Sequence, residues 1–173
     1  MERNKFYSFK LKGWHTSVDG VIELIGSEWI LVKRITVDYT LDGYSLIQRK
    51  YIESNQCDDE TSFTEKVLLA KGIMDIPNFY NISLETQTDP FTWLKERNVV
   101  VQFNPKDDSI CYVGRIGDMS KKFFQIMSMD TRGGWDTVSY KYTYAKIVAI
   151  DIDSDYVNSL ITYSNFESKK DSF

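Results

Sequence analysis

The sequence predicts a mainly β (α+β) protein with two small five-stranded barrels in tandem, joined by a connector helix. Strand-like runs fill both ends of the 173-residue chain, and turn signals separate them at similar spacing. The middle is acidic, with 2 basic and 7 acidic side chains over residues 57–89. We therefore expect a first barrel over 1–56, a connector over 57–89, a second barrel with a helix at each end over 90–164, and a polar tail over 165–173.

Strand patterns are clearest in the C-terminal part of the chain. Five short strands within about 55 residues suit a small barrel or sandwich. The predicted strands cover residues 98–103, 110–116, 123–129, 135–144 and 146–151. Gly133-Gly134 predicts a sharp hairpin tip between the third and fourth of them, because glycine adopts positive φ without steric cost.

The N-terminal part repeats this plan. Its predicted strands cover residues 5–12, 18–25, 29–37 and 44–54. A shift of 91 residues places Gly43 on Gly134, whereas a shift of 95 pairs Tyr51 with Lys146 at the last strand. These coincidences favour an internal duplication. The alternative is two unrelated β segments with similar hairpin turns.

Three helices are predicted outside the strands. A capping box, Ser62 with Glu65, begins a helix over 62–72, and Gly72 can adopt the left-handed conformation that ends it. Pro90 suits the first turn of a second helix that runs to Arg97. A third helix begins near Ser154, and the polar residues after it are expected to fray.

Residues 90–151 resemble the Sm-like family, in which a short helix precedes five bent strands that close into a small barrel. Gly114 followed by Ile116 fits the second-strand pattern of that family, and residues 5–56 resemble a degenerate second copy. At the positions of the family's RNA-binding Asp and Asn this chain has Ser120 and Phe124, or Gly26 and Ile30 in the first copy. The resemblance thus implies the fold and not uridine-specific RNA binding.

Reactive residue patterns are missing from the sequence. His15 is the only histidine, and no Walker, dinucleotide or G-x-S-x-G motif occurs. Cys57 and Cys111 form no C-x-x-C pair, and we expect Cys111 to be buried within a strand. The calcium-like run from Asp151 to Asp155 lacks the required Gly and Glu. We therefore predict no catalytic residue, no metal and no cofactor.

Contacts to a ligand or to nucleic acid are predicted from aromatic and basic residues. Tyr140, Tyr142 and Tyr144 alternate along one strand, so they share a face that either packs inside a barrel or stacks bases. Basic residues complete the candidate set: Lys121 with Lys122 in the loop between the second and third predicted strands, Arg49 with Lys50, and Lys146.

The preferred functional hypothesis is a non-enzymatic binding or assembly module that acts through protein–protein contacts, because small barrels leave unpaired edge strands. Such edges also allow homo-oligomers. One alternative is a protein that binds single-stranded RNA or DNA, although the net charge of −4 argues against strong non-specific binding. A second is a carboxylate-based hydrolase such as a glycosidase. Apolar runs of about four residues predict no membrane span, and we expect a cytoplasmic protein.

Overall fold

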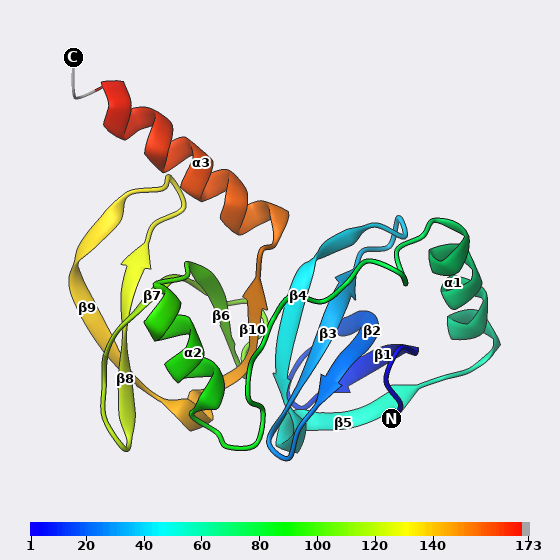
Figure 1. The fold of residues 1–173 in the computed structure, drawn as a ribbon. Helices are drawn as coiled ribbons and strands as arrows, with labels where there is room; N and C mark the ends of the chain where they lie inside the picture. Colours follow the sequence, from blue (N-terminus) through cyan, green and yellow to red (C-terminus); the bar gives the residue numbers. More distant parts are fainter. Residues whose placement is uncertain (171–173) are drawn as a thin grey trace.

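The computed structural model describes residues 1–170, and it confirms a mainly β protein with three α-helices (Figure 1). The first five strands are β1 (Phe6–Leu11), β2 (Ser17–Ile25), β3 (Trp29–Ile35), β4 (Leu41–Gln48) and β5 (Ile52–Gln56). The other five are β6 (Val101–Pro105), β7 (Tyr112–Met119), β8 (Phe123–Met129), β9 (Trp135–Thr143) and β10 (Ile147–Ile152). The helices are α1 (Asp59–Ala70), α2 (Asp89–Arg97) and α3 (Asp155–Lys170), and short 3₁₀ turns precede β5 and β10, namely η1 (Arg49–Tyr51) and η2 (Tyr144–Lys146).

All ten strands belong to one antiparallel sheet with the order β5-β1-β2-β3-β4-β10-β6-β7-β8-β9. The prediction of two separate closed barrels is therefore wrong. The physical reason is the pairing of β4 with β10, which joins the halves of the molecule edge to edge. Leu46 and Ile47 lie opposite Ile150 and Ala149 there, and all four side chains are buried.

The two halves have the same strand order and the same register. We call β1–β5 with α1 the first half, and α2 with β6–β10 and α3 the second half. Corresponding strands begin 94 or 95 residues apart, so the 91-residue shift expected from the hairpins is wrong. Tyr7 lies opposite Gly20 in the first half, and Val101 lies opposite Gly114 in the second, each 94 residues later.

Gly20 in β2 and Gly114 in β7 occupy equivalent positions in the register. A Cβ atom at Gly20 would lie 2.3 Å from the carbonyl oxygen of Lys33. At Gly114 it would lie 2.3 Å from the carbonyl oxygen of Met127. The close approach of neighbouring backbone therefore requires glycine at both positions.

Helix α1 begins three residues earlier than predicted. Its capping box consists of Asp58 and Thr61, so the box expected from Ser62 and Glu65 is wrong. Asp58 is the earlier of two suitable caps, and the two acidic residues that follow it favour the positive end of the helix dipole. Gly72 has a φ of 71°, which confirms the left-handed stop.

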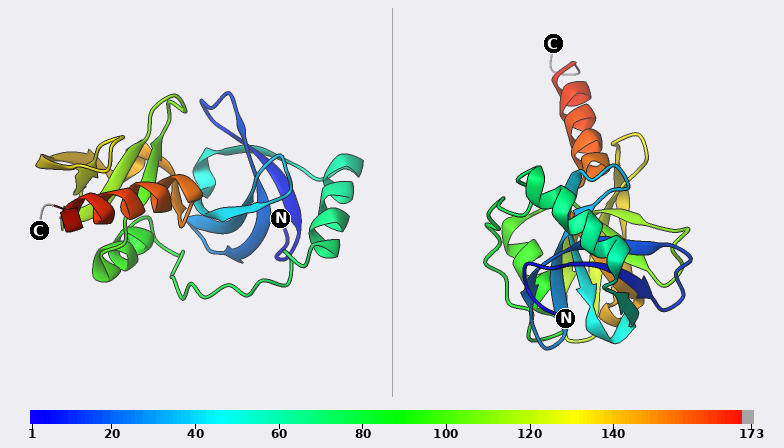
Figure 2. Two further views of the ribbon diagram at one scale, coloured as in Figure 1. Left: turned by 90° about the horizontal axis from the view of Figure 1, so that it is seen from above. Right: turned by 90° about the vertical axis from the view of Figure 1, so that its right-hand side faces the viewer.

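The third helix is confirmed after Ser154, but it continues to Lys170. The predicted polar tail is therefore wrong for residues 165–170, while 171–173 lie outside the described residues. Val157 and Leu160 anchor α3 on the sheet by packing against Val113 and Met129. Helices α1 and α3 lie at opposite ends of the molecule (Figure 2). Within residues 1–170, no helix is long and apolar enough to cross a membrane.

The largest apolar cluster combines residues of both halves. Helix α2 inserts Phe91 beside Trp29 of β3, with ring centroids 5.9 Å apart. Phe91 also lies 4.6 Å from Phe124 of β8, and all three rings are fully buried. This shared packing holds the halves together in addition to the β4–β10 pairing.

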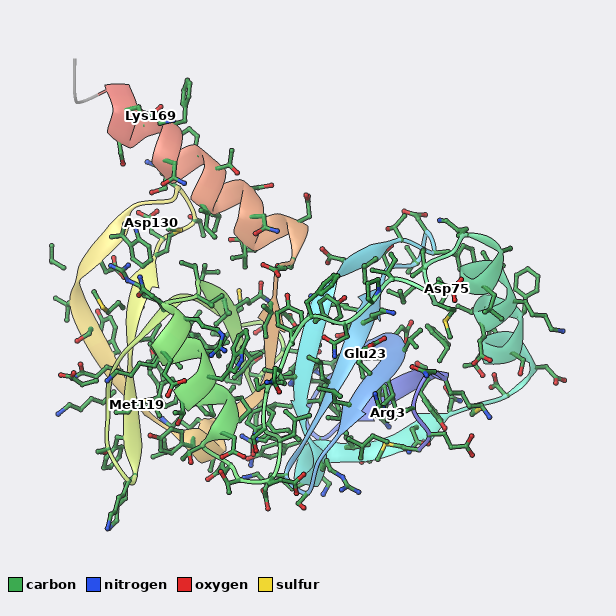
Figure 3. The ribbon with its side chains drawn as sticks, in the orientation of Figure 1. Arg3, Glu23, Asp75, Met119, Asp130 and Lys169 are labelled. Atoms are coloured by element: carbon green, nitrogen blue, oxygen red, sulfur yellow. The ribbon has the colours of Figure 1, made fainter. Side chains whose placement is uncertain are left out.

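A buried ion pair lies beneath the connector in the first half. Lys33 Nζ is 2.8 Å from Glu23 Oε1, and both residues are buried (Glu23 is labelled in Figure 3). The same ammonium group donates a hydrogen bond to the carbonyl oxygen of Met74 in the connector. The connector therefore shields this pair from water and receives one of its hydrogen bonds.

Candidate interface at the free sheet edges

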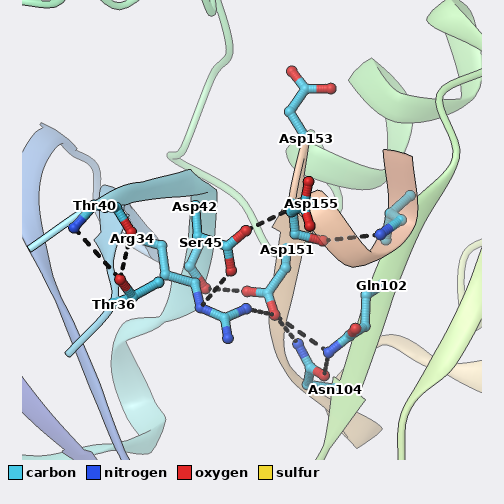
Figure 4. A network of polar contacts seen from close by, with 12 residues as sticks. Arg34, Thr36, Thr40, Asp42, Ser45, Gln102, Asn104, Asp151, Asp153 and Asp155 are labelled. Atoms are coloured by element: carbon cyan, nitrogen blue, oxygen red, sulfur yellow. Dashed lines mark hydrogen bonds and ion pairs between the residues drawn. The ribbon is translucent and has the colours of Figure 1, made fainter. Parts of the chain in front are cut away.

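The pairing of β4 with β10, which we call the internal junction, shows how this fold joins two strand edges. Ser45 lies opposite Asp151 in the register, and Tyr44 lies opposite Ile152. Ser45 donates a 2.6 Å hydrogen bond to Asp151 Oδ1 (Figure 4). The junction is thus a continuous antiparallel ladder with a side-chain bond across it.

Asp151 is the polar centre of the internal junction. Its Oδ2 accepts 2.9 Å hydrogen bonds from Arg34 Nη1 and Asn104 Nδ2 and a weaker one from Gln102 (Figure 4). Burial raises the pKa of Asp151, while Arg34 and the bonds from Ser45 and Asn104 oppose that rise. Both oxygens of this buried carboxyl group therefore accept hydrogen bonds, as is usual for a buried polar group.

The two ends of the sheet, β5 and β9, are its free edges. Strand β9 pairs with β8 alone among the described strands, and seven of its nine residues are exposed. Trp135 is 41% exposed, Val138 57% and Tyr140 54%. A long, exposed edge with large apolar side chains is a template for pairing with another strand.

A shallow depression of about 320 Å³ lies beside β9, and we call it the tyrosine hollow. Its lining includes Tyr112, Met129, Tyr140 and Tyr142. The rings of Tyr112 and Tyr142 lie 4.9 Å apart, and burial together with Tyr112 raises the pKa of Tyr142 to about 12. The Tyr142 hydroxyl therefore loses its proton less readily than that of a free tyrosine, which suits an apolar contact surface.

The tyrosine hollow has an equivalent at the internal junction. A depression of about 410 Å³ there is lined by Ser17, Val18, Asp19, Arg34 and Ile35, and the register maps these onto five residues of the tyrosine hollow. The five matching residues are Cys111, Tyr112, Val113, Ser128 and Met129. In the first half, Asp151 of β10 borders the depression. In the second half, no described strand lies beside β9 in the place that β10 takes beside β4, so this side of the tyrosine hollow has no neighbouring strand.

The three predicted tyrosines do not all share one strand face. Strand β9 ends at Thr143, and Tyr144 lies in η2, so that part of the prediction is wrong. Tyr144 is buried, and its hydroxyl donates a 2.7 Å hydrogen bond to the carbonyl oxygen of Ser120. Tyr140 and Tyr142 do line one hollow. Tyr144 instead supports the turn between β7 and β8.

The predicted basic residues lie in two groups. Lys121 and Lys122 are exposed at the β7–β8 turn, which Tyr144 supports. Arg49 and Lys50 lie in η1, close to Lys146, because the hydroxyl of Tyr51 in η1 hydrogen-bonds the carbonyl oxygen of Ala145 in η2. Arg49 Nη1 donates a 2.7 Å bond to the carbonyl oxygen of Gly26, so this side chain braces its own half.

The cysteines differ from the prediction in their exposure. Cys57 and Cys111 are both free thiols and exposed, so the expectation of a buried Cys111 is wrong, because β7 begins only at Tyr112. Among the described residues, no group of three His, Cys, Asp or Glu side chains could hold a metal ion.

Sequence reasoning missed the residues of the internal junction. Arg34 and Asp151 are 117 residues apart, and Ser45 and Asp151 are 106 apart. No local motif marks such a contact. The one usable signal was a polar residue inside an otherwise apolar strand, Asp151 at the end of β10.

Comparisons with known proteins add no relative. No protein-family model matches the chain, and neither the curated proteins nor the solved structures contain a match.

Proposed function

We propose that the protein is a non-enzymatic assembly module whose β9 edge pairs with β5 of a second copy of the same chain. The observation that carries this proposal is the internal junction, in which β4 pairs with β10. In the shared register, β9 corresponds to β4 and β5 corresponds to β10. The two free edges are thus equivalent to the two edges that the chain already pairs at the internal junction.

The position of the helices supports the same pairing. Helix α3 follows β10 directly and does not block the pairing of β4 with β10, because its apolar residues pack on Val113 and Met129. Helix α1 follows β5 in the same way and packs on Phe6 and Ile35, at positions equivalent in the register to Val100 and Met129. Helix α1 therefore packs over the sheet and not along the free edge of β5, and its first turn lies at the end of that edge, as the first turn of α3 lies beside Asp42 of β4.

The register of the internal junction predicts which residues meet. Ser45 lies opposite Asp151 at the internal junction, so their equivalents Tyr140 and Gln56 should lie opposite each other between two copies. In the same way, Ser139 and Cys57 are the equivalents of Tyr44 and Ile152 and should also lie opposite each other. The side chain of Gln56 then borders the tyrosine hollow as Asp151 borders its counterpart. This head-to-tail contact is heterologous, so it either closes into a ring or continues as a filament.

The repeated order and register also support our interpretation that the halves arose by duplication, and that each is a variant of the Sm-like strand arrangement. The pairing proposal does not depend on that origin, because it uses only the register.

Cross-linking tests the pairing. In a Cys111→Ser background, Ser139→Cys places a thiol opposite Cys57 of a second copy. Directly opposed residues have Cα atoms about 4.5–5.5 Å apart, which suits a disulfide. We expect rapid formation of covalent oligomers under mild oxidation, resolved on a non-reducing gel.

The matched control is Thr143→Cys in the same background, which moves the thiol about 13 Å along β9. Equal cross-linking of the two variants would contradict the register. Analytical ultracentrifugation supplies a second readout: the unmodified chain should be oligomeric, and Val138→Lys with Tyr140→Lys should make it monomeric. Phe79→Lys, at an exposed connector residue, should leave the mass unchanged. A monomeric unmodified chain at high concentration would end the proposal.

A further inference from the structure

Three lysines from separate segments lie around η1 at the boundary between the halves, and two of them face the ring of Tyr51. Lys50 Nζ lies 5.1 Å from the ring centroid, and Lys106 Nζ lies 5.4 Å from it. Lys12 Nζ donates a 2.8 Å hydrogen bond to the carbonyl oxygen of Lys50. We call Lys12, Lys50 and Lys106 the lysine cluster. In a chain with a net charge of −4, this is a local concentration of positive charge.

The segments that carry the lysine cluster are fixed by hydrogen bonds. Lys12 N donates a 2.8 Å bond to the carbonyl oxygen of Tyr51. Trp14 Nε1, two residues after Lys12, donates a 2.9 Å bond to the carbonyl oxygen of Pro105, next to Lys106. The hydroxyl of Tyr51 ties η1 to η2. The arrangement is therefore held in place before any ligand arrives.

The two acidic residues that follow Lys106 hold other groups, and Glu53, three residues after Lys50, forms an ion pair with Lys10. Asp107 accepts hydrogen bonds from the amide and hydroxyl of Ser109, and Asp108 accepts them from the backbone amides of His15 and Thr16. In the part of the chain that the structure describes, none of the three lysines forms a salt bridge. Among the described residues, no carboxylate therefore contacts these ammonium groups directly, and the charge of Glu28 acts on Lys50 from a longer distance.

The lysine cluster carries electrostatic repulsion as well. Burial lowers the pKa of Lys50; the charge of Glu28 raises it, and the charge of Lys106 lowers it by a smaller amount. An anion placed between the two ammonium groups would remove this repulsion.

The chemistry of the site indicates the class of anion. Ammonium groups act as compact point charges that suit phosphate oxygens. Tyr51 is only 8% exposed and already has ammonium groups against its ring, so it has no open face on which a base could stack. Recognition through charge alone therefore favours the phosphate part of a ligand.

We propose that the lysine cluster binds a phosphate-rich anion, with Lys50 and Lys106 as its direct contacts. Lys12 orders the site, because its ammonium group is already bonded to the backbone of Lys50. Residues of both halves contribute, so the site exists only because the halves are joined. This binding is independent of strand pairing at β9.

Calorimetric titration tests the site, with tripolyphosphate as the probe at low ionic strength. The double variant Lys50→Gln with Lys106→Gln should bind at least about tenfold more weakly than the unmodified chain. The control, Lys66→Gln with Lys95→Gln, removes the same charge from exposed positions on α1 and α2 and should keep the affinity. Affinity should also fall as salt is added, because exposed charges are screened.

Parallel titrations with ATP and with a single-stranded oligonucleotide identify the source of the phosphate. Binding of either that is lost in the Lys50→Gln, Lys106→Gln variant supports the site. The proposal would be overturned by no binding of any of the three probes, or by equal weakening in the control variant. Oligonucleotide binding that survives the double variant, with no tripolyphosphate binding, would also overturn it. Circular dichroism verifies that each variant is folded.

Discussion

The same sheet position carries opposite chemistry in the two halves. Lys33 lies opposite Val21 in the first half, and Met127 lies opposite Arg115 in the second, so Lys33 and Met127 are equivalent. Lys33 is buried beneath the connector with Glu23, whereas Met127 is 38% exposed. Backbone pairing thus sets the fold at this position. The segment that packs over the strand, here the connector over Lys33, decides whether a charged or an apolar side chain occupies this position.

The buried pair gives the largest expected effect. Lys33→Met copies the second half but leaves the Glu23 carboxylate buried without its partner, so we expect a loss of about 3–5 kcal/mol in the free energy of unfolding. Chemical denaturation measures it. Adding Glu23→Gln should recover most of the loss. Met127→Lys, at the exposed equivalent, should change stability by about 0.5 kcal/mol or less. Equal losses at Lys33 and Met127 would contradict the comparison.

The two equivalent glycines should respond alike. Gly20→Ala and Gly114→Ala each force a Cβ against a carbonyl oxygen, so each should cost about 2–3 kcal/mol. Gly117→Ala is the control, because its Cβ would meet no described atom closer than 3.4 Å, and it should be tolerated. Thermal unfolding of the three variants distinguishes them. A tolerated Gly20→Ala would show that the close backbone approach seen at Gly114 does not constrain Gly20 in the same way.

The local features of this fold were predictable. Nine β-prone runs bounded by turn signals located the ten strands to within a few residues, with the run 44–54 containing parts of both β4 and β5. Gly72 marked the end of α1 because a left-handed residue is needed there. The pairing of β4 with β10 was not predictable, because strand patterns specify which face is buried and not which strand lies beside it.

The candidate interface was predicted only in part. Tyr140 and Tyr142 were identified by alternation, and they do line one hollow. Tyr144 was misplaced because nothing in the sequence marks a 3₁₀ turn after Thr143. Lys12 and Lys106 were not identified, because their convergence on Tyr51 depends on long-range packing.

The internal junction should be sensitive to the shape of Asp151 more than to its charge. Asp151→Ala leaves buried donors of Ser45 and Asn104 without a partner, and we expect a loss of about 2 kcal/mol. Asp151→Asn keeps an acceptor oxygen and should cost less than about 1 kcal/mol, because burial already raises the pKa of this carboxyl group. Urea denaturation compares the two variants. A larger loss for Asn than for Ala would exclude this account.

The smallest expected effect concerns the helix at the C-terminal end of each half, α1 and α3. Asp58 caps α1 by accepting a 3.0 Å hydrogen bond from Thr61 N, so Asp58→Ala should cost about 1 kcal/mol. At α3, Asp42 accepts a 2.8 Å bond from Asp155 N, and Asp42→Ala should cost a similar amount. Helical content by circular dichroism during thermal unfolding measures both. No change in either variant would show that packing alone fixes these helices.

The sheet order has a consequence for folding during synthesis. Strands β1 to β5 are complete by residue 56, yet the partner of β4 begins only at Ile147. The edge that carries Leu46 and Ile47 therefore stays open while roughly ninety further residues are translated, which takes about 5–20 seconds at ribosomal speed. During that interval a nascent chain exposes the very edge that a neighbouring nascent chain on the same messenger could pair with. Efficient production should thus depend on how fast the second half follows the first.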